Sequence, residues 1–454
     1  MNILKSSRGK TASLLILSVA IISLSTFSGL SSGCGGSGGD QGSPQGDTSG
    51  TGGTIVGSGG SDGSGGVTEI GGSSGTPGVG SGGDSGSGGG VAGSSGSGGS
   101  SEVLRIEKLV TKGSQSCVLL SNGTIKCWGY NEFGQLGDGT TTNRKTPVLV
   151  NGINTAIDVA LGDTHSCAIL SNHTIQCWGG NDVGQLGDGT TVNRLAPVNV
   201  VDIFNATAIA LGVQYTCALL SDTTVKCWGA NSSGQLGNGL TSNSPTPVAV
   251  TTITTATDLS VGSSHTCVIL ANHSIKCWGL NNTGQLGNAL TTNSSNPVTA
   301  TSISTAKKIS LGYGHTCALL ASNEINCWGL NRSGQLGDSS NTNSFPAVVV
   351  SHINNADTVY AGESYTCAHL NDNGLRCWGD NSSGQLGDNT TSSRNEPVAV
   401  SEITSSRSIS AGYIHTCALI NDTSVQCWGD NSAGQLGNNS TTDSPAPVTV
   451  VNLP

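Results

Sequence analysis

Short runs of apolar and β-branched residues alternate with polar turns through most of the chain, and the pattern recurs every 50 residues. In the second copy we expect four strands, at residues 156–161, 166–170, 174–178 and 197–201. Alternation on this scale is typical of half-buried strands. Gly and Asn punctuate the segments between them, as turns require. No helical periodicity interrupts the pattern.

The tryptophans mark the repeat most clearly. All seven lie 50 residues apart, each between Cys and Gly, and each is followed by Asn and then by Gly-Gln-Leu-Gly. They are Trp128, Trp178, Trp228, Trp278, Trp328, Trp378 and Trp428. Seven four-stranded units of this length predict an all-β fold, a seven-bladed β-propeller over residues 103–454. We expect the tryptophans to pack in its core.

The ends of the repeat region predict how the ring closes. The first copy begins with an expected strand at 104–110 and has no Pro-Val strand before it, whereas the last copy ends with a Pro-Val strand at 447–451. We therefore expect the N- and C-terminal strands to pair and to complete one blade from both ends. Closure removes the exposed sheet edges of an open array, and we expect a monomeric propeller.

Every repeat carries two cysteines ten residues apart, and a three-residue turn at 121–123 would place the first pair directly opposite on neighbouring strands. Cα separations in such pairs suit a disulfide. Each bond would stabilise the fold by about 2 to 3 kcal/mol. Free buried thiols and zinc binding are the alternatives, but zinc motifs such as Cys-x2-Cys are absent. The expected pairs are Cys117–Cys127, Cys167–Cys177, Cys217–Cys227, Cys267–Cys277, Cys317–Cys327, Cys367–Cys377 and Cys417–Cys427.

Residues 1–33 have the pattern of a secretion signal. A positively charged start precedes an apolar stretch at about 14–27, which is too short for a comfortable membrane span. Small residues then lead to Cys34, as in bacterial lipoprotein signals, although Ser31 stands where those signals prefer Leu. Seven pairs use fourteen of the fifteen cysteines and leave Cys34 over. We expect Cys34 to be lipidated; an ordinary cleaved signal with an incidental cysteine is the alternative.

Residues 34–102 are almost entirely Gly and Ser after the cysteine. Such a segment cannot bury enough apolar surface to offset chain entropy, so we expect a disordered tether that spans about 45 Å on average. A low-complexity insertion without a role is the alternative. Together with Cys34, the tether predicts a propeller anchored to the bacterial cell envelope, at the outer membrane, on its periplasmic or its outer face.

Charge and composition restrict the possible partners. The formal net charge is −10, and only 10% of the residues are charged. Nucleic-acid binders usually carry a basic patch, so we expect no nucleic-acid partner. Fifteen cysteines also indicate an oxidising compartment rather than the cytosol.

The repeat resembles the regulator of chromosome condensation repeat family. The second copy shows the motif at Gly162, His165, Ser166, Ala168, Leu170, Trp178, Gly179, Asn181 and Gly184 to Gly187. The resemblance covers about residues 103–454 and implies a seven-bladed propeller, here in a bacterial secreted lipoprotein form. The eukaryotic founder of the family is a nucleotide-exchange factor for a small GTPase. Transfer of that activity to this chain would rest on fold analogy alone.

Two repeated features could in principle bind metal. His165, His265, His315 and His415 share one repeat position, where the other copies have Gln115, Tyr215 and Tyr365. These histidines could form a ring of metal ligands or serve as polar residues of the repeat structure. We favour the structural role. The Gly-Gln-Leu-Gly run lacks the oxygen ligands of a calcium loop and favours a turn. With no nucleophile motif or phosphate loop either, we expect no catalytic residue, no cofactor and no metal.

Function should lie at positions that differ between copies. The candidate partner-binding residues are Tyr130, Glu132, Phe133, Arg144, Arg194, Arg332 and Arg394. Aromatic residues and Arg anchor many interfaces; drift in solvent-exposed loops is the alternative. We expect a non-enzymatic binding or scaffold module for a protein or a glycan. Exchange or effector activity on a small GTPase, and a propeller lyase or glycosidase, are the alternatives.

Overall fold

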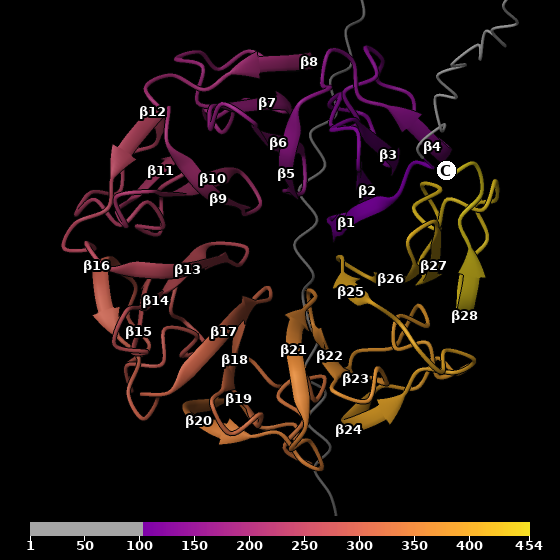
Figure 1. The fold of residues 1–454 in the computed structure, drawn as a ribbon. Helices are drawn as coiled ribbons and strands as arrows, with labels where there is room; N and C mark the ends of the chain where they lie inside the picture. Colours follow the sequence, from indigo (N-terminus) through magenta and orange to yellow (C-terminus); the bar gives the residue numbers. More distant parts are fainter. Residues whose placement is uncertain (1–102) are drawn as a thin grey trace, which may run out of the picture. The chain divides into compact units, whose positions relative to one another are not determined.

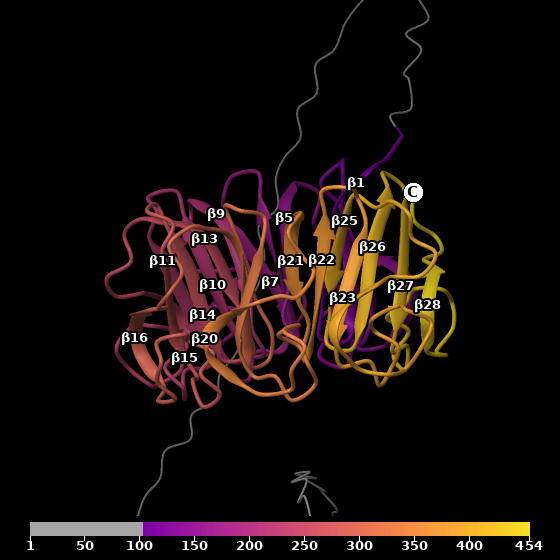
Figure 2. The same ribbon diagram turned by 90° about the horizontal axis from the view of Figure 1, so that it is seen from below.

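The computed structural model describes residues 103–454, which form 28 β-strands in seven four-stranded antiparallel sheets. The sheets stand as blades around a central axis, as Figure 1 shows. In the perpendicular view of Figure 2, the strands run between the two faces of the ring. No helix occurs in residues 103–454, and the predicted seven-bladed, all-β propeller is confirmed. The predicted signal segment, Cys34 and the tether lie outside the described residues.

Within each blade the four strands follow one another from the axis outwards. The innermost strands are β1 (Ile106–Lys112), β5 (Ala156–Leu161), β9 (Ala206–Leu211), β13 (Ala256–Val261), β17 (Ala306–Leu311), β21 (Ala356–Ala361) and β25 (Ser408–Ala411). The second strands are β2 (Gln115–Leu120), β6 (His165–Leu170), β10 (Tyr215–Leu220), β14 (His265–Leu270), β18 (His315–Leu320), β22 (Tyr365–Leu370) and β26 (His415–Asn421).

The outer half of each blade completes the sheet. The third strands are β3 (Ile125–Gly129), β7 (Ile175–Gly179), β11 (Val225–Gly229), β15 (Ile275–Gly279), β19 (Ile325–Gly329), β23 (Leu375–Gly379) and β27 (Ser424–Gly429). The outermost strands are β4 (Arg144–Leu149), β8 (Arg194–Asn199), β12 (Ser244–Ala249), β16 (Ser294–Thr299), β20 (Ser344–Val349), β24 (Arg394–Ala399) and β28 (Ser444–Thr449). Every residue of β2 is buried and none of β4 is, so the second strand carries the core and the fourth is the edge.

The strands expected in the second repeat are confirmed except at the outer edge. The first three differ from expectation by no more than one residue at either end, but the fourth is residues 194–199 rather than 197–201. Its polar start pairs with the third strand, with Arg194 opposite Gly179. The side chains of an edge strand face solvent, so its sequence is as polar as that of a loop. The first residues of this strand were therefore predicted as loop. The first strand likewise starts at Ile106 and extends to Lys112, because its polar end continues the pairing.

The expected pairing of the chain's two ends is wrong. β28 pairs with β27 of its own repeat, and β4 completes the first blade, so each blade is one continuous repeat. The two ends of the chain would have to complete one blade together only if the outer strand of each repeat joined the sheet of the next blade. Here the outer strand returns to the sheet of its own repeat. The ends meet by packing instead. Leu104 and Leu453 cover the same core cluster, and Lys126 Nζ donates to the Asn452 carbonyl at 3.0 Å.

The predicted hairpin and its disulfide are confirmed in every blade. In the first blade the turn at 121–123 places Leu119 opposite Ile125 and Cys117 opposite Cys127. All seven pairs are disulfide-bonded, with Cα separations of 4.0–4.1 Å. The Leu120 amide donates to the Thr124 carbonyl, so Leu120 and Thr124 are a hydrogen-bonded pair. Hydrogen-bonded and non-hydrogen-bonded pairs alternate along the ladder, and the cysteines, three positions further along, are therefore a non-hydrogen-bonded pair. Such pairs have the closest Cα atoms in an antiparallel ladder.

Each blade packs on the next through one recurring set of contacts. Between the first two blades, Trp178 Nε1 and Ser166 Oγ both donate to the Gln135 carbonyl, at 2.9 and 2.8 Å. Gly137 lies against the indole, with φ +69°, and a Cβ there would be 2.7 Å from Nε1. The fully buried indole packs in one cluster with the disulfide of the first blade. The predicted core role of the tryptophans and the turn at Gly-Gln-Leu-Gly are confirmed.

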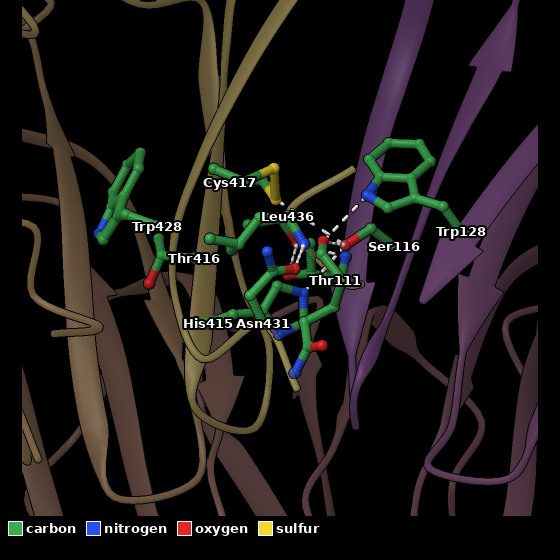
Figure 3. Close-up of a disulfide and its surroundings, with 12 residues drawn as sticks. Thr111, Ser116, Trp128, His415, Thr416, Cys417, Trp428, Asn431 and Leu436 are labelled. Carbon is green, nitrogen blue, oxygen red and sulfur yellow. Dashed lines mark hydrogen bonds between the residues drawn. A yellow bond between two sulfur atoms is a disulfide. The ribbon is translucent and has the colours of Figure 1, made fainter. Parts of the chain in front are cut away.

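The closing junction repeats this arrangement. Figure 3 shows Trp128 and Ser116 of the first blade facing His415 of the last. Trp128 Nε1 donates to the Gln435 carbonyl at 2.9 Å, and Ser116 Oγ lies 2.9 Å from His415 Nε2. Thr111 adds a backbone N–H that donates to Ser410 Oγ at 2.9 Å. The ring therefore closes through the same side-chain contacts that join its other blades.

The four histidines at the shared position are structural. His165 Nε2 lies 2.8 Å from Thr216 Oγ1, and that hydroxyl donates its single proton to the Gln185 carbonyl. The histidine must therefore donate from Nε2, which leaves its buried Nδ1 without a partner among the described residues. Burial lowers the pKa of this imidazole to about 3. Tyr215 serves the same position in the third blade, where its hydroxyl donates to the His265 carbonyl at 2.6 Å.

We expect Gly337→Ala to destabilise the propeller strongly. Gly337 has φ +68°, and a Cβ there would lie 2.6 Å from Trp378 Nε1. Gly152→Ala is the matched control, because Gly152 has φ +75° and no atom within 4 Å of the position that a Cβ would take. In guanidinium unfolding, Gly337→Ala should lose about 2 kcal/mol more than Gly152→Ala, the cost of overpacking beyond backbone strain. Equal losses would show that the indole does not hold this glycine.

Acid should destabilise the folded protein through its buried histidines. His165, His265, His315 and His415 each have a pKa lowered to about 3 by burial, from the usual 6.5. The unfolded chain therefore binds protons below pH 6.5 that the folded protein does not, and the free energy of unfolding falls as the pH falls from 6.5 toward 3. At pH 4.5 the loss is about 3 kcal/mol per histidine.

This pH effect can be measured by denaturant unfolding at pH 7 and pH 4.5. His315→Gln is the test variant, since Gln115 occupies the equivalent position in the first blade. The variant should lose about 3 kcal/mol less between the two pH values than the unmodified protein does. The same loss in both proteins would contradict the assignment.

Candidate functional site

The two faces of the ring are built from different parts of the repeat. The inner-turn face carries the residues between the first and second strands of each blade, together with Lys112 at the end of β1. These residues, here called the inner turns, are 112–114, 162–164, 212–214, 262–264, 312–314, 362–364 and 412–414. It also carries the segment after each Trp-Gly, which is residues 130–133, 180–183, 230–233, 280–283, 330–333, 380–383 and 430–433. The opposite face, called the hairpin face, carries the disulfide hairpin turns and the linkers between blades.

Backbone hydrogen bonds join the inner turns into a rim around the axis. The amide of Tyr413 donates to the Gly113 carbonyl at 2.9 Å, and that of Tyr313 donates to the Glu363 carbonyl at 3.0 Å. Similar bonds of 3.4 Å join three further pairs of neighbouring blades. Within residues 103–454 no such bond joins the first blade to the second or the second to the third. The hydrogen-bonded rim is therefore interrupted on both sides of Asp163, although the backbone still packs closely there, since a Cβ on Gly113 would lie 2.9 Å from Asp163 Cα.

Lys112 stands on this rim at a position where the other six repeats have glycine. In the second blade the imidazole ring of His165 leaves no space for a side chain at this position, because a Cβ on Gly162 would lie 2.6 Å from Cε1 of His165. The first repeat has Gln115 instead of that ring, and the unbranched glutamine leaves space for Lys112. The two substitutions together place one cation among the inner turns.

Burial and neighbouring charges shift the pKa values of three groups near the axis, Lys112, Asp163 and Glu363. Burial lowers the pKa of Lys112 and raises that of Asp163, and each group opposes the shift of the other. Burial also raises the pKa of Glu363, against a hydrogen bond from Tyr413. The negative charges of Asp163 and Asp380 add to that rise. Lys112 thus interacts with Asp163, while Asp163 and Asp380 both act on Glu363.

The centre of the face is almost filled. A hollow of about 20 Å³ lies on the axis, which has room for about one water molecule. Five residues around it, here called the axial cluster, are Lys112, Asp163, Tyr313, Glu363 and Tyr413. Tyr313 and Tyr413 remain 48% and 39% exposed, so they present their rings to solvent beside the closed centre.

Two larger hollows adjoin the axial cluster. The Tyr130 hollow, of about 320 Å³, is lined by residues of the first, second and seventh blades: Gly113, Ser114, Tyr130, Phe133, Asp163, Thr164 and Tyr413. The Leu280 hollow, of about 270 Å³, lies at the third, fourth and fifth blades and includes Val213, Ala230, Leu280 and Tyr313. Because each shares residues with the axial cluster, the three hollows form one continuous site.

Models of the repeat family match most of the propeller. One model of the Regulator of chromosome condensation (RCC1) repeat matches residues 122–169, 174–219, 224–269, 276–319 and 373–419. A second matches residues 108–135, 156–185, 206–235, 256–285, 306–335, 357–385 and 407–435. The chain belongs to the RCC1 repeat family. The resemblance inferred from the sequence motif is confirmed. Among curated protein sequences, none matches this chain.

Solved RCC1-type propellers share the fold. Prp20p from Saccharomyces cerevisiae is 20% identical, with a TM-score of 0.65 over 77% of this chain and 88% of that one. The same yeast protein bound to Kap60 gives 20% identity and a TM-score of 0.66, over 76% of this chain and 86% of that one. Human WBSCR16 is 18% identical, with a TM-score of 0.65 over 72% and 95%. At this identity the likeness supports the fold alone.

Three of the predicted binding residues of this RCC1-repeat propeller lie together. Tyr130 and Phe133 line the Tyr130 hollow, with ring centroids 6.3 Å apart in an edge-on arrangement. The Tyr130 hydroxyl donates to Glu132 at 2.8 Å. Burial and this hydrogen bond to Glu132 raise the pKa of Tyr130 to about 12, so the phenol stays protonated. Their role in binding stays a prediction.

Three of the predicted arginines hold their own loops. The arginines form ion pairs within their blades, and the pairs are Arg144–Asp138, Arg194–Asp188 and Arg394–Asp388. Burial raises the pKa of each of these carboxyls, but hydrogen bonds from Thr and Arg outweigh it and lower the pKa overall. The arginines are only about a third exposed, at 33%, 35% and 39%. Arg332 is exposed on the fifth blade. None of these four arginines lines the three hollows of the inner-turn face.

The axial cluster was not among the residues singled out from the sequence. Its signal was present: one position is glycine in six repeats and lysine at 112. The next position differs in nearly every repeat, and it is Gly113, Asp163, Val213, Ser263, Tyr313, Glu363 and Tyr413. The strand was expected at 104–110, but β1 extends to Lys112, so the sequence did not show that this lysine ends the innermost strand beside the axis.

In residues 103–454, no group of three or more His, Cys, Asp or Glu is arranged to hold a metal ion. The same range contains no helix that is long and apolar enough to cross a membrane.

Proposed function

We propose that this chain is a non-enzymatic binding module of the bacterial cell envelope, and that its inner-turn face holds a protein or glycan partner. The observation that carries the proposal is the continuous site around the axis. Side chains that differ between otherwise near-identical repeats meet there, beside hollows that are open to solvent. Exposed aromatic side chains beside charged groups are the usual anchors of interfaces.

The size of the central hollow favours binding over catalysis. Asp163 and Glu363 have pKa values raised by burial, as many catalytic carboxyls do. A lyase or glycosidase would need both groups beside a substrate bond. The hollow they face holds about one water molecule, at about 20 Å³. A sugar ring cannot enter between them, so a ligand would lie against the face.

Exchange activity on a small GTPase is the second candidate. Prp20p, which shares the fold, is described as binding Gsp1p and histones. That protein is 20% identical to this chain, and its site residues cannot be carried over at this distance. Acceleration of nucleotide release from a GTPase by the purified propeller would support this candidate over a binding role alone.

We further propose that the module is exported and held at the membrane by a lipid on Cys34. The other fourteen cysteines form seven disulfides within the propeller, which fits an oxidising compartment. Cys34 is the one cysteine left over, and an unpaired thiol is a liability there unless it is modified. Residues 35–102 would then be the tether between the lipid and the ring.

Replacement of Cys34 tests the anchor. We expect Cys34→Ser to release the protein from the membrane fraction and to abolish incorporation of radiolabelled palmitate, because the thioether to the lipid cannot form. Ser32→Ala, which keeps a small residue before the cysteine, should remain anchored. A mature N-terminal peptide that contains Cys34 without lipid would contradict this part of the proposal.

Site-specific cross-linking on intact cells tests the binding face. We expect a photoreactive phenylalanine analogue at Tyr413 or Tyr313 to cross-link a partner that mass spectrometry can identify. The matched control is the same analogue at Phe204, an aromatic residue that is 72% exposed on the hairpin face. Equal cross-linking from both faces, or none from the inner-turn face, would count against the proposed function.

A further inference from the structure

We propose that the partner presents a cationic side chain, arginine in preference to lysine, to the Tyr130 hollow and the axial cluster. This inference rests on the proposed binding function and specifies its chemistry. Three properties of the site carry it: its charge, its aromatic lining and one unpaired hydroxyl.

The inner-turn face has a marked excess of negative charge. Its turns and Trp-Gly segments contain six carboxylates, which are Glu132, Asp163, Asp182, Glu363, Asp380 and Asp430. They contain only two cations, Lys112 and Arg332. Complementary charge across an interface steers encounter and selects partners. A basic group on the partner is therefore the favoured match.

The repulsion among these carboxylates is partly uncompensated. Asp163 and Asp380 both disfavour the charged form of Glu363, and Lys112 is the one cation of the axial cluster. An added cation beside Asp163 would offset the charge that Asp163 presents to Glu363. The two junctions on either side of Asp163 are the ones that no backbone hydrogen bond joins across the rim.

The lining of the Tyr130 hollow suits the shape of an arginine. Its surface is mainly apolar, with the rings of Tyr130, Phe133 and Tyr413 on its walls and Asp163 at its inner end. Arginine buries its methylene stem on apolar surface while its head group meets charge or an aromatic face. A volume of about 320 Å³ leaves space for such a chain, whereas the hollow of about 20 Å³ within the axial cluster does not.

A buried hydroxyl at the edge of the same hollow has no partner. Thr164 Oγ1 is buried and makes no hydrogen bond within the described residues, although it belongs to the lining. Thr164 follows Asp163 directly, so a rotation of its side chain toward the hollow would let one planar head group donate to the carboxylate and to the hydroxyl together. Guanidinium has five N–H donors in a fixed plane, which is the geometry for two adjacent acceptors.

The test uses labelled peptides as probes on the intact propeller. A fluorescent hexa-arginine peptide should bind at 0.15 M salt, and a hexa-citrulline peptide, which has nearly the same shape without charge, should not. The double variant Asp163→Asn with Glu363→Gln should weaken binding at least about tenfold. Its matched control is Glu107→Gln with Glu402→Gln, two exposed carboxylates toward the hairpin face that lose the same charge.

A second variant acts in the opposite direction. Lys112→Gly restores the residue found in the other six repeats and removes the competing cation. Binding of hexa-arginine should then tighten by at least about threefold. This result does not depend on whether the double variant folds. Hexa-lysine should bind more weakly than hexa-arginine to all variants.

Several outcomes would overturn the inference. They are equal weakening by the site variant and its hairpin-face control, binding of hexa-citrulline as tight as hexa-arginine, or no tightening in Lys112→Gly. The proposed function fails separately, when no partner cross-links from Tyr413 or Tyr313. If a partner cross-links there and the charge variants bind it normally, the proposed binding function is supported and only the proposed arginine recognition is wrong.

Discussion

The structure depends on one contact, the donation of each tryptophan N–H to the backbone carbonyl of the glutamine in the preceding blade. That bond is 2.9–3.0 Å long at all seven junctions, including the one that closes the ring. A serine or threonine hydroxyl shares the same carbonyl, and a glycine with positive φ admits the indole. A tryptophan, a glutamine turn and a glycine must therefore recur together at a fixed spacing, and they account for the invariance of the repeat.

The same contact explains where variation is possible. Residues at a junction are held by two blades at once, and even the histidine position admits only Gln and Tyr as replacements. The inner turns lie beyond the junctions, and there the sequence differs freely. Lys112 illustrates the boundary between these zones, because it stands at a glycine position and coincides with the loss of a ring at Gln115. A change at the rim is thus coupled to a change in a junction.

Much of the fold could be predicted because its determinants are local. The tryptophan spacing indicated seven blades, and a three-residue turn was enough to place Cys117 opposite Cys127. The way in which the ring closes is not determined by local sequence. A Pro-Val strand at a fixed distance from its neighbours can join either adjoining blade, and only the packed structure shows β28 returning to β27. The arginines were misleading for a similar reason: the aspartate that pairs with Arg144 lies six residues earlier, in a segment that reads as an ordinary polar turn.

The site arises from broken symmetry in a symmetric scaffold. Seven equal repeats would place seven equal turns around the axis, and equal charges in such a ring would repel one another. Here the turns differ, so a lysine, two carboxylates and two tyrosines share the centre. The backbone bonds of the rim hold five junctions and end on either side of Asp163. The side of the ring where these bonds are missing is also the side with the aromatic hollow and with the Thr164 hydroxyl, which has no partner among the described residues. This asymmetry gives a ligand one preferred direction of approach.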